Sequence, residues 1–335
     1  MRVLVTGGAG YIGSVCVEEL SNQGHSVVVV DNLQEGHREA LLPGAVFYEG
    51  NFGDKGLLNN IFNTHEIDAV IHFAAETTVE FSMTDPQIYF INNLVNPINL
   101  LEIMRKYECR KFIFSSTAAT FGEPKYTPID EKHLQKPINA YGESKLMFEK
   151  VLDWYHFAYK FKFNVFRYFN AAGASERLGE DHAKETHLIP IVLKTAYNVK
   201  NNESFESSLK VFGRDYPTDD GTCVRDYIHV IDLAKAHILS LDNLEKYPDA
   251  KYNMGNGKGF SVLEVIEIAK KVTGVDIPYE LAGKRAGDPA ILVASSEKIK
   301  KEMGWEPLYP DLETIIKTAW DWHERHPEGY RLDEK

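Results

Sequence analysis

Short hydrophobic runs alternate with longer amphipathic stretches through the first half of the chain. The short runs are rich in β-branched and aromatic residues and predict strands, whereas the longer stretches have the periodicity of helices. The predicted strands are residues 2–6, 26–30, 46–48, 69–73, 111–115 and 164–168. The helices predicted between most of them are residues 11–23, 55–64, 86–107 and 141–159. Six such strands predict an α/β protein with a doubly wound parallel sheet.

The regular alternation ends after residue 169. A Gly/Asp-rich stretch follows, then polar residues at 200–208, and further helices are predicted at residues 188–199, 232–244, 261–273 and 312–323. We therefore predict a domain over residues 1–172 and a smaller α/β domain over residues 173–335, with some segments crossing between them. Because no long linker separates the two, we expect them to pack together.

The composition is that of an ordinary folded protein. Hydrophobic residues make up 44% of the 335 and charged residues 26%, which argues against disordered and collagen-like classes. The net charge of −12 disfavours nucleic acid and anionic membranes as partners. Three widely spaced cysteines without a CxxC pair predict free thiols: Cys16, Cys109 and Cys223. With no leader pattern and no membrane-length apolar run, we expect a cytoplasmic protein.

The first motif is Thr-Gly-Gly-Ala-Gly-Tyr-Ile-Gly at residues 6–13, between the first strand and the first helix. Gly7 allows a tight turn, Gly10 lets the backbone approach a pyrophosphate, and Gly13 permits close packing of helix on strand. Eighteen residues after Gly13, Asp31 ends the second strand. There it can accept hydrogen bonds from both hydroxyls of an adenosine ribose and would repel a 2′-phosphate. The motif therefore predicts a dinucleotide site that favours NAD over NADP.

The second motif is a tyrosine and a lysine four residues apart, Tyr141 and Lys145, near the start of a predicted helix. Both side chains lie on one helix face and can meet a common ligand. Tyrosine has a reference pKa of about 10, so ionisation near pH 7 needs ~4 kcal/mol of stabilisation, which an ammonium and an oxidised nicotinamide can supply. Thr117 closes a Ser-Ser-Thr run at the end of the fifth strand, where it can hydrogen-bond the hydroxyl being deprotonated.

These motifs resemble the extended short-chain dehydrogenase/reductase family, and further segments resemble its UDP-glucose 4-epimerase group over nearly the whole chain. The segments are IHFAA at 71–75, YGESKL at 141–146, RYFN at 167–170, GTCVRDYIHV at 221–230 and RAGD at 285–288. The resemblance implies a Rossmann-type NAD-binding domain over residues 1–172 and a nucleotide-sugar-binding domain over residues 173–335. It also implies an isomerase of galactose and carbohydrate metabolism that interconverts UDP-galactose and UDP-glucose through a 4-keto sugar with tightly bound NAD.

The resemblance further implies a role for individual residues. Tyr141 takes the O4 proton, Lys145 holds the nicotinamide ribose and lowers the tyrosine pKa, and Thr117 bridges O4. The residues implied at NAD are Gly7, Gly10, Tyr11, Ile12, Gly13, Asp31, Asn32, Asn51, Phe52, Phe73, Ala74, Ala75, Asn92, Tyr141, Lys145 and Phe169. Those implied at the substrate are Thr117, Tyr141, Asn170, His187, Leu188, Phe212, Arg225, Tyr227, Arg285, Asp288 and Leu292. A homodimer is implied through helices around residues 93–107 and 141–159.

Several positions depart from the family pattern. Thr117 replaces the usual serine but keeps the hydroxyl, and Asn51 stands where an aspartate commonly accepts from adenine. His187 falls where some members carry asparagine, and residues 77–82 lack the usual Gly-Glu-Ser run, so no role is assigned to that loop. Leu292 stands where some members carry the larger tyrosine near the sugar C2. The hypothesis is that UDP-GalNAc and UDP-GlcNAc are also accepted, although a neighbouring side chain could close the gap.

Other functions stay open at this point. A nucleotide-sugar 4,6-dehydratase needs an added acid and base, but Thr117 is followed by Ala118 and Ala119. Another NAD-dependent nucleotide-sugar epimerase of the same family is harder to exclude, because the sugar is the part of the substrate that is held least. A non-enzymatic NAD-sensing interaction protein is the remaining alternative. No metal is expected, because the histidines show no ligand spacing, as at His25 and His65.

Overall fold

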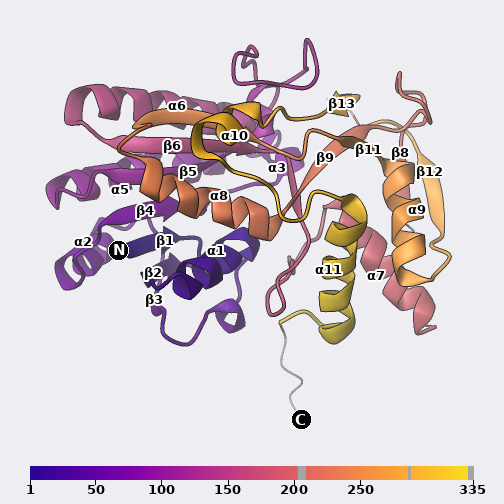
Figure 1. The fold of residues 1–335 in the computed structure, drawn as a ribbon, viewed down its shortest axis with the longest axis horizontal. Helices are drawn as coiled ribbons and strands as arrows, with labels where there is room; N and C mark the ends of the chain where they lie inside the picture. Colours follow the sequence, from indigo (N-terminus) through magenta and orange to yellow (C-terminus); the bar gives the residue numbers. More distant parts are fainter. Residues whose placement is uncertain (203–208, 286–287, 331–335) are drawn as a thin grey trace.

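The computed structural model describes residues 1–202, 209–285 and 288–330. Part of the polar segment at 200–208, and two residues of the RAGD motif, lie outside these ranges. The large sheet is parallel, with the order β10-β6-β5-β4-β1-β2-β3 (Figure 1). Its strands are β1 (Arg2–Thr6), β2 (Ser26–Asp31), β3 (Val46–Glu49), β4 (Ala69–His72), β5 (Lys111–Thr117), β6 (Lys162–Tyr168) and β10 (Asp249–Met254). The predicted doubly wound fold is confirmed.

The sequence analysis expected six strands, and the sheet has seven. The additional strand, β10, pairs with β6, and the paired residues Asp249 and Phe163 are 86 positions apart in the sequence. Its sequence, DAKYNM, alternates polar and apolar residues, but aspartate, lysine, asparagine and alanine are depleted in strands. The prediction was wrong here because residue preference argued against a strand that pairing with the distant β6 stabilises.

Helices cover both faces of the large sheet. Val3 and Val5 pack into one core, beneath α1 and α8, whereas Leu4 points to the other, beneath α2, α5 and α6. The helices of this part are α1 (Tyr11–Asn22), α2 (Lys55–Thr64), α3 (Val79–Ser82), α4 (Pro86–Phe90), α5 (Asn96–Lys106), α6 (Ala140–Tyr159), α8 (Val230–Asn243) and α10 (Glu297–Met303). Two short 3₁₀ turns are η1 (Arg38–Ala40) and η3 (Ala118–Thr120). This double covering explains why the central strands are nearly all apolar.

The helix predicted over residues 86–107 is interrupted by a π-helical segment, η2 (Ile91–Val95). Pro97 lies in the first turn of α5. Because proline has no N–H, it cannot donate to the carbonyl of Asn93 as an α-helix requires. A wider turn results, of the kind often found at functional sites.

The second group of elements lies beside the large sheet, on the right in Figure 1. A four-stranded sheet has the order β11-β9-β13, with β7 also paired to β9, and β12 pairs with β8. The strands are β7 (Asn170–Ala172), β8 (Leu209–Phe212), β9 (Val224–His229), β11 (Gly259–Ser261), β12 (Tyr279–Ala282) and β13 (Ile291–Leu292). A third core fills the space against α7 (Leu188–Lys200), α9 (Val262–Thr273) and α11 (Leu312–Arg325). The domain division at residue 172 stays a prediction.

Candidate functional site

The residues predicted at the cofactor gather along the carboxyl edge of the large sheet. They follow five of its parallel strands, and this edge is where doubly wound folds bind ligands. They are Gly7, Gly10, Tyr11, Ile12 and Gly13 after β1; Asp31 and Asn32 at the end of β2; Asn51 and Phe52 after β3; Phe73, Ala74 and Ala75 after β4; and Phe169 after β6. Asn92 lies in η2. The fold thus brings together residues that are up to 162 positions apart in sequence, as the hydrogen bond from Tyr11 to Gly173 illustrates.

The glycine turn after β1 has the shape that a pyrophosphate requires. Gly7 has φ +73, and a Cβ at Gly13 would lie 2.0 Å from the Gly7 carbonyl oxygen, so both positions exclude larger residues. A Cβ at Gly10 would meet only the Gly7 oxygen, at 3.5 Å. Gly10 is therefore open on its outer side, where α1 begins without a side-chain cap on its N–H groups. These features fit a dinucleotide bound at the helix N-terminus.

Asp31 is held in place by the backbone. Its Oδ2 accepts from the N–H of Ala9 at 3.0 Å and its Oδ1 from the N–H of Leu33 at 2.9 Å. Each carboxylate oxygen keeps a second lone pair for another donor. Asp31 is buried beside the glycine turn, with an exposed fraction of 8%. A pair of ribose hydroxyls fits this arrangement.

Asn93 was missed by the sequence analysis, although it organises the wall next to this edge. Its side chain bonds both backbone groups of Glu76, at 2.9 and 3.0 Å, and donates to Ser144 Oγ at 3.1 Å. Neighbouring Asn92 donates to the Glu76 carboxylate at 2.9 Å. The only sequence signal was a polar residue within an amphipathic helix, and its partners were not predictable. Asn93 therefore ties the loop after β4 to α6.

The predicted acid–base residues lie at the junction of β5 and α6. Asn139 caps α6 by accepting from the Gly142 N–H at 2.8 Å. A Cβ at Gly142 would lie 2.4 Å from the Ala119 carbonyl oxygen, so this glycine lets α6 approach the end of β5. Tyr141, in the first turn, thereby comes within hydrogen-bond reach of Thr117. The helix spacing alone did not show this approach.

Burial shifts the pKa values of both groups in the cofactor-free chain. Burial raises the pKa of Tyr141, and the hydrogen bond with Thr117 only partly opposes this rise. Lys145 donates to the Ser115 carbonyl at 2.9 Å, and burial lowers the pKa of its ammonium to about 7, against the attraction of Glu149. The cofactor-free chain thus raises the tyrosine pKa through burial, and the lowering effect implied for Lys145 stays a prediction. Further positive charge is required to favour the phenolate.

A buried ion pair supports this junction from below, and the sequence analysis did not find it. Arg167 and Glu149 are 3% and 1% exposed, with Nη2 and Oε2 2.5 Å apart. Ser116 Oγ donates to Glu149 Oε1 at 2.6 Å. The pair therefore links β5, β6 and α6, the three elements that carry Thr117, Tyr141 and Lys145.

Apart from Thr117 and Tyr141, the residues predicted at the substrate come from the second group of elements. Arg225 in β9 pairs with Asp288, and Leu292 in β13 lies in register with Arg225. The Arg285 guanidinium lies 3.9 Å from the centroid of the Phe212 ring. The two predicted cations thus belong to the two smaller sheets: Arg225 lies in the four-stranded sheet, and Arg285 contacts β8 of the two-stranded sheet. Each contacts another predicted substrate residue.

The remaining predicted residues lie in the part of the chain that follows β6 and leads into the second group of elements. Asn170 in β7 faces Tyr227 across the strand pair, and its side chain donates to the Asp226 carbonyl at 2.9 Å. His187 precedes Leu188 at the start of α7. His187 Nδ1 lies 2.9 Å from Glu180 Oε1, so one ring nitrogen is already engaged and Nε2 is left for another partner.

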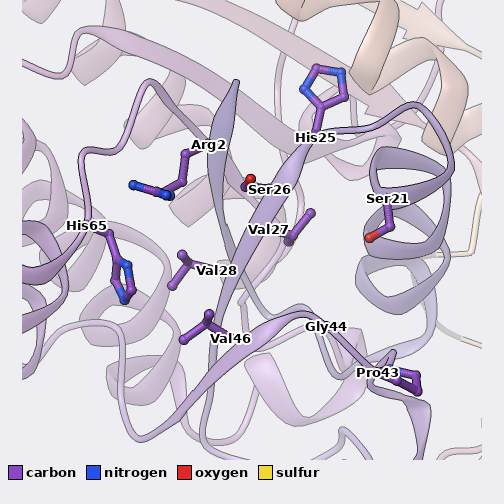
Figure 2. A pocket seen from close by; sticks show the side chains of 10 residues that line it. All are labelled: Arg2, Ser21, His25, Ser26, Val27, Val28, Pro43, Gly44, Val46 and His65. Atoms are coloured by element: carbon purple, nitrogen blue, oxygen red, sulfur yellow. The ribbon is translucent and has the colours of Figure 1, made fainter.

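A separate hollow lies at the opposite, amino-terminal edge of the large sheet (Figure 2). It has a volume of about 400 Å³ and is lined by Arg2, Ser21, His25, Ser26, Val27, Val28, Pro43, Gly44, Val46 and His65. Because β1, β2 and β3 begin there, it is remote from the edge that gathers the predicted residues. Its lining does not include Tyr141 or Lys145.

The fold and the carboxyl-edge site define a nucleotide-binding α/β protein of the doubly wound class. Residues 3–255 match the model of the NAD dependent epimerase/dehydratase family, and the chain belongs to this family. A UDP-glucose 4-epimerase from Halalkalibacterium halodurans is 51% identical, over 100% of this chain and 99% of that protein. Among the helices of the described residues, none has both the length and the apolar character that a membrane crossing requires.

Solved structures are similar over the whole length. A crystal structure of a UDP-glucose 4-epimerase has a TM-score of 0.94 and 49% identity, covering 99% of this chain and 100% of that one. The UDP-glucose 4-epimerase from Bifidobacterium longum, in complex with NAD+ and UDP, has a TM-score of 0.92 and 37% identity, covering 98% and 100%. The resemblance seen in the sequence motifs is confirmed.

Proposed function

We propose that this chain is an NAD-dependent UDP-glucose 4-epimerase that interconverts UDP-galactose and UDP-glucose. The observation that carries the proposal is the meeting of Thr117, Tyr141 and Lys145 at the same sheet edge as the Gly10 turn. The full-length similarity to UDP-glucose 4-epimerases supports it. The dehydratase alternative is disfavoured because η3 supplies alanines at the two positions after Thr117, where an acid and a base would be needed.

The residues that fit NAD would hold it across the carboxyl edge, with its pyrophosphate at the Gly10 turn and its adenosine ribose at Asp31. When bound, NAD supplies the hydride acceptor and donor for C4 of the sugar. Its positive charge acts in the direction that the buried phenol needs, because a nearby cation favours the phenolate. Tyr141 then takes the O4 proton and returns it in the reverse half-reaction, while Thr117 holds O4 by a hydrogen bond.

Epimerisation requires the 4-keto sugar to present either face, so the chain should grip the UDP part and leave the hexose loosely held. Arg225 and Arg285 provide guanidinium groups for a diphosphate. Arg285 is braced by its contact with Phe212. Asp288 forms an ion pair with Arg225, which keeps that guanidinium in place. The strong contacts thus gather on the nucleotide side.

The direct test is to incubate purified protein, without added NAD, with UDP-galactose and to resolve the products by chromatography. Formation of UDP-glucose by the wild-type chain, and its loss in Tyr141→Phe with unchanged NAD content, is the expected result. A 4-keto-6-deoxy product would instead identify a dehydratase. No conversion, even with added NAD, would overturn the proposed activity.

A wider sugar range is a second proposal, and it rests on Leu292. This residue lies in register with Arg225, beside the predicted diphosphate contacts. Because leucine is smaller than tyrosine, it leaves room for a 2-acetamido group near the sugar C2. UDP-GalNAc, offered in the same chromatographic assay, tests this range independently of UDP-galactose.

We also propose a homodimer formed through α6 and the neighbouring η2 segment, which pack together. Trp154 and Phe157 are 70% and 71% exposed, and Ile91 and Val95 each are 43% exposed. Large apolar side chains exposed together favour a second copy as the partner. Sedimentation velocity should show a dimer for the wild-type chain and a monomer for Trp154→Glu. A monomer in both proteins would contradict the proposal.

A cytoplasmic location is proposed as well, supported by three buried free thiols among the described residues.

A further inference from the structure

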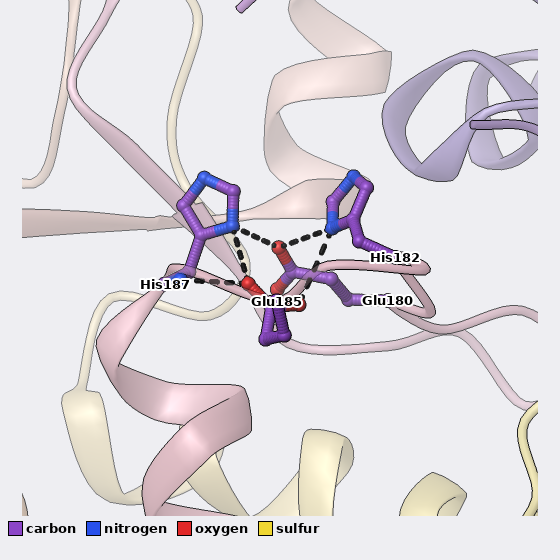
Figure 3. Close-up of side chains that lie close together, drawn as sticks. All are labelled: Glu180, His182, Glu185 and His187. Carbon is purple, nitrogen blue, oxygen red and sulfur yellow. Dashed lines mark hydrogen bonds and ion pairs between the residues drawn. The ribbon is translucent and has the colours of Figure 1, made fainter. Parts of the chain in front are cut away.

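A compact cluster of two glutamates and two histidines lies in the loop between β7 and α7. Glu180, His182, Glu185 and His187 turn their side chains toward one another (Figure 3). One ligand-type atom from each residue lies within 4.8 Å of the other three. The sequence analysis expected no metal, because it found no ligand spacing among the histidines. These four residues are spaced two, three and two apart on a segment without helical or strand periodicity. Their approach to one another follows from the path of the loop.

The separations at His182 match those of a four-coordinate metal, and those at His187 are shorter. Zinc bonds to imidazole nitrogen and carboxylate oxygen are about 2.0–2.2 Å long, so the edges of a zinc tetrahedron are about 3.3–3.6 Å. His182 Nδ1 lies 3.4 Å from Glu180 Oε1 and 3.3 Å from Glu185 Oε2. His187 Nδ1 lies 2.9 Å from Glu180 Oε1 and 2.8 Å from Glu185 Oε1. To hold one ion among all four residues, His187 has to move away from the carboxylates, and the widest separations, which reach up to 4.8 Å, have to shorten by about an ångström.

The charges also favour a divalent cation. Glu180 is buried, with an exposed fraction of 7%. Within the described residues, the ion pairs of Glu180 and Glu185 are with these two imidazoles alone. A buried carboxylate needs an opposite charge close by. A divalent ion held by two carboxylates and two neutral imidazoles gives a site without net charge.

The outer contacts position the ligands as a metal site requires. The backbone N–H groups of Thr186 and His187 donate to Glu185 Oε1, at 2.7 and 2.6 Å. Both imidazoles present Nδ1 inward, so their Nε2 atoms are directed away from the carboxylates (Figure 3). Hydrogen bonds that hold a ligating carboxylate in place, as at Glu185, are characteristic of metal sites.

We propose that Glu180, His182, Glu185 and His187 form a structural zinc site. A set of four nitrogen and oxygen ligands suits four-coordinate Zn²⁺ better than Mg²⁺ or Ca²⁺, which prefer six or more oxygen ligands. With four protein ligands the site has no open position, so its role is to cross-link the loop. The bound ion fixes His187 immediately before α7, the residue predicted to reach the nucleotide sugar. This proposal is independent of the sugar that the chain converts.

The test uses untagged full-length protein, stripped with a chelator and dialysed against equimolar zinc. Metal analysis should find about one zinc per wild-type chain and less than a tenth of that in His182→Gln, which removes one ligand. The matched control is His65→Gln, since His65 lies at the opposite edge of the sheet and contacts Tyr48 instead. This control should retain about one zinc per chain.

A second measurement keeps the proposal testable if His182→Gln fails to fold, which far-UV circular dichroism and NAD content will show. Cobalt added to the stripped wild-type chain should produce the intense visible absorption of a tetrahedral site, and equimolar zinc should abolish it. Zinc should also raise the Tm of the wild-type chain and not that of a folded His182→Gln. Zinc content that is equal in both proteins, or a cobalt spectrum of six-coordinate type, would overturn the proposal.

Discussion

Replacement of Gly10 by alanine should separate cofactor binding from folding. The added methyl group would meet only the Gly7 carbonyl oxygen at 3.5 Å, and Gly10 has φ −78, which alanine adopts readily. Alanine is a poorer helix N-cap than glycine, but it also reduces the entropy of the unfolded chain. Each effect is about 0.5–1 kcal/mol and the two oppose each other. The free energy of unfolding of the cofactor-free chain should therefore change little.

NAD binding should weaken, because the methyl group occupies the open side where the pyrophosphate is placed. Forcing one methyl group into a close contact costs about 1–3 kcal/mol, which corresponds to an increase in Kd of about 5- to 150-fold. NAD content after purification, and a fluorescence titration of the cofactor-free protein, measure this change. Urea unfolding of the same sample measures the stability.

The matched variant is Gly13→Ala, whose Cβ would lie 2.0 Å from the Gly7 oxygen. Here the backbone itself must move, so stability should fall by about 1–3 kcal/mol together with the loss of NAD. If Gly10→Ala binds NAD as tightly as the wild-type chain, the placement of the dinucleotide over Gly10 is refuted. If it is as destabilised as Gly13→Ala, the geometry of the turn is wrong.

Three further predictions concern the acid–base pair and the sugar pocket. Tyr141→Phe removes the group that we propose carries the O4 proton, so kcat should fall by about 10²- to 10⁴-fold with NAD content unchanged, and a smaller loss would reassign the base. Because burial lowers the pKa of Lys145 to about 7, the unfolded chain binds a proton that the folded cofactor-free chain has released between pH 7 and 10. The free energy of unfolding should therefore rise with pH through this range. The rise should be steeper in the wild-type chain than in Lys145→Met by up to about 1.4 kcal/mol per pH unit. Urea unfolding at several pH values measures it, and an equal pH dependence in both proteins would contradict this reasoning. Leu292→Tyr should lower kcat/KM for UDP-GalNAc at least about tenfold relative to UDP-galactose. The reason is that the larger side chain crowds only the acetamido group, at a cost of about 1–3 kcal/mol. An unchanged ratio would show that position 292 does not border that group.

The features that the sequence predicted correctly are those written in local patterns. The glycine spacing around Gly10, the aspartate at the end of β2 and most helices and strands of the first half follow from turn geometry and residue periodicity. The four-residue step from Tyr141 to Lys145 is likewise a property of one helix. Each depends on neighbours within one or two elements, so no knowledge of the distant chain was needed.

Other features depend on residues that the chain brings together from afar. The addition of β10 to the large sheet, the contacts of Asn93 with Glu76 and the buried pair of Arg167 with Glu149 join separate elements. The raised pKa of Tyr141 is of the same kind, because burial is decided by everything packed around the ring.

The chain's own sequence determined the class of fold, the glycine turn and the placement of Tyr141 and Lys145 on one helix face, since these arise from short-range spacing and backbone preference. Tertiary structure alone decided the environment that tunes those groups and the meeting of four metal-type ligands around His187. Desolvation, ion pairing and coordination depend on distances in space, and a loop without periodicity gives no signal of which side chains it will bring within a few ångströms of one another.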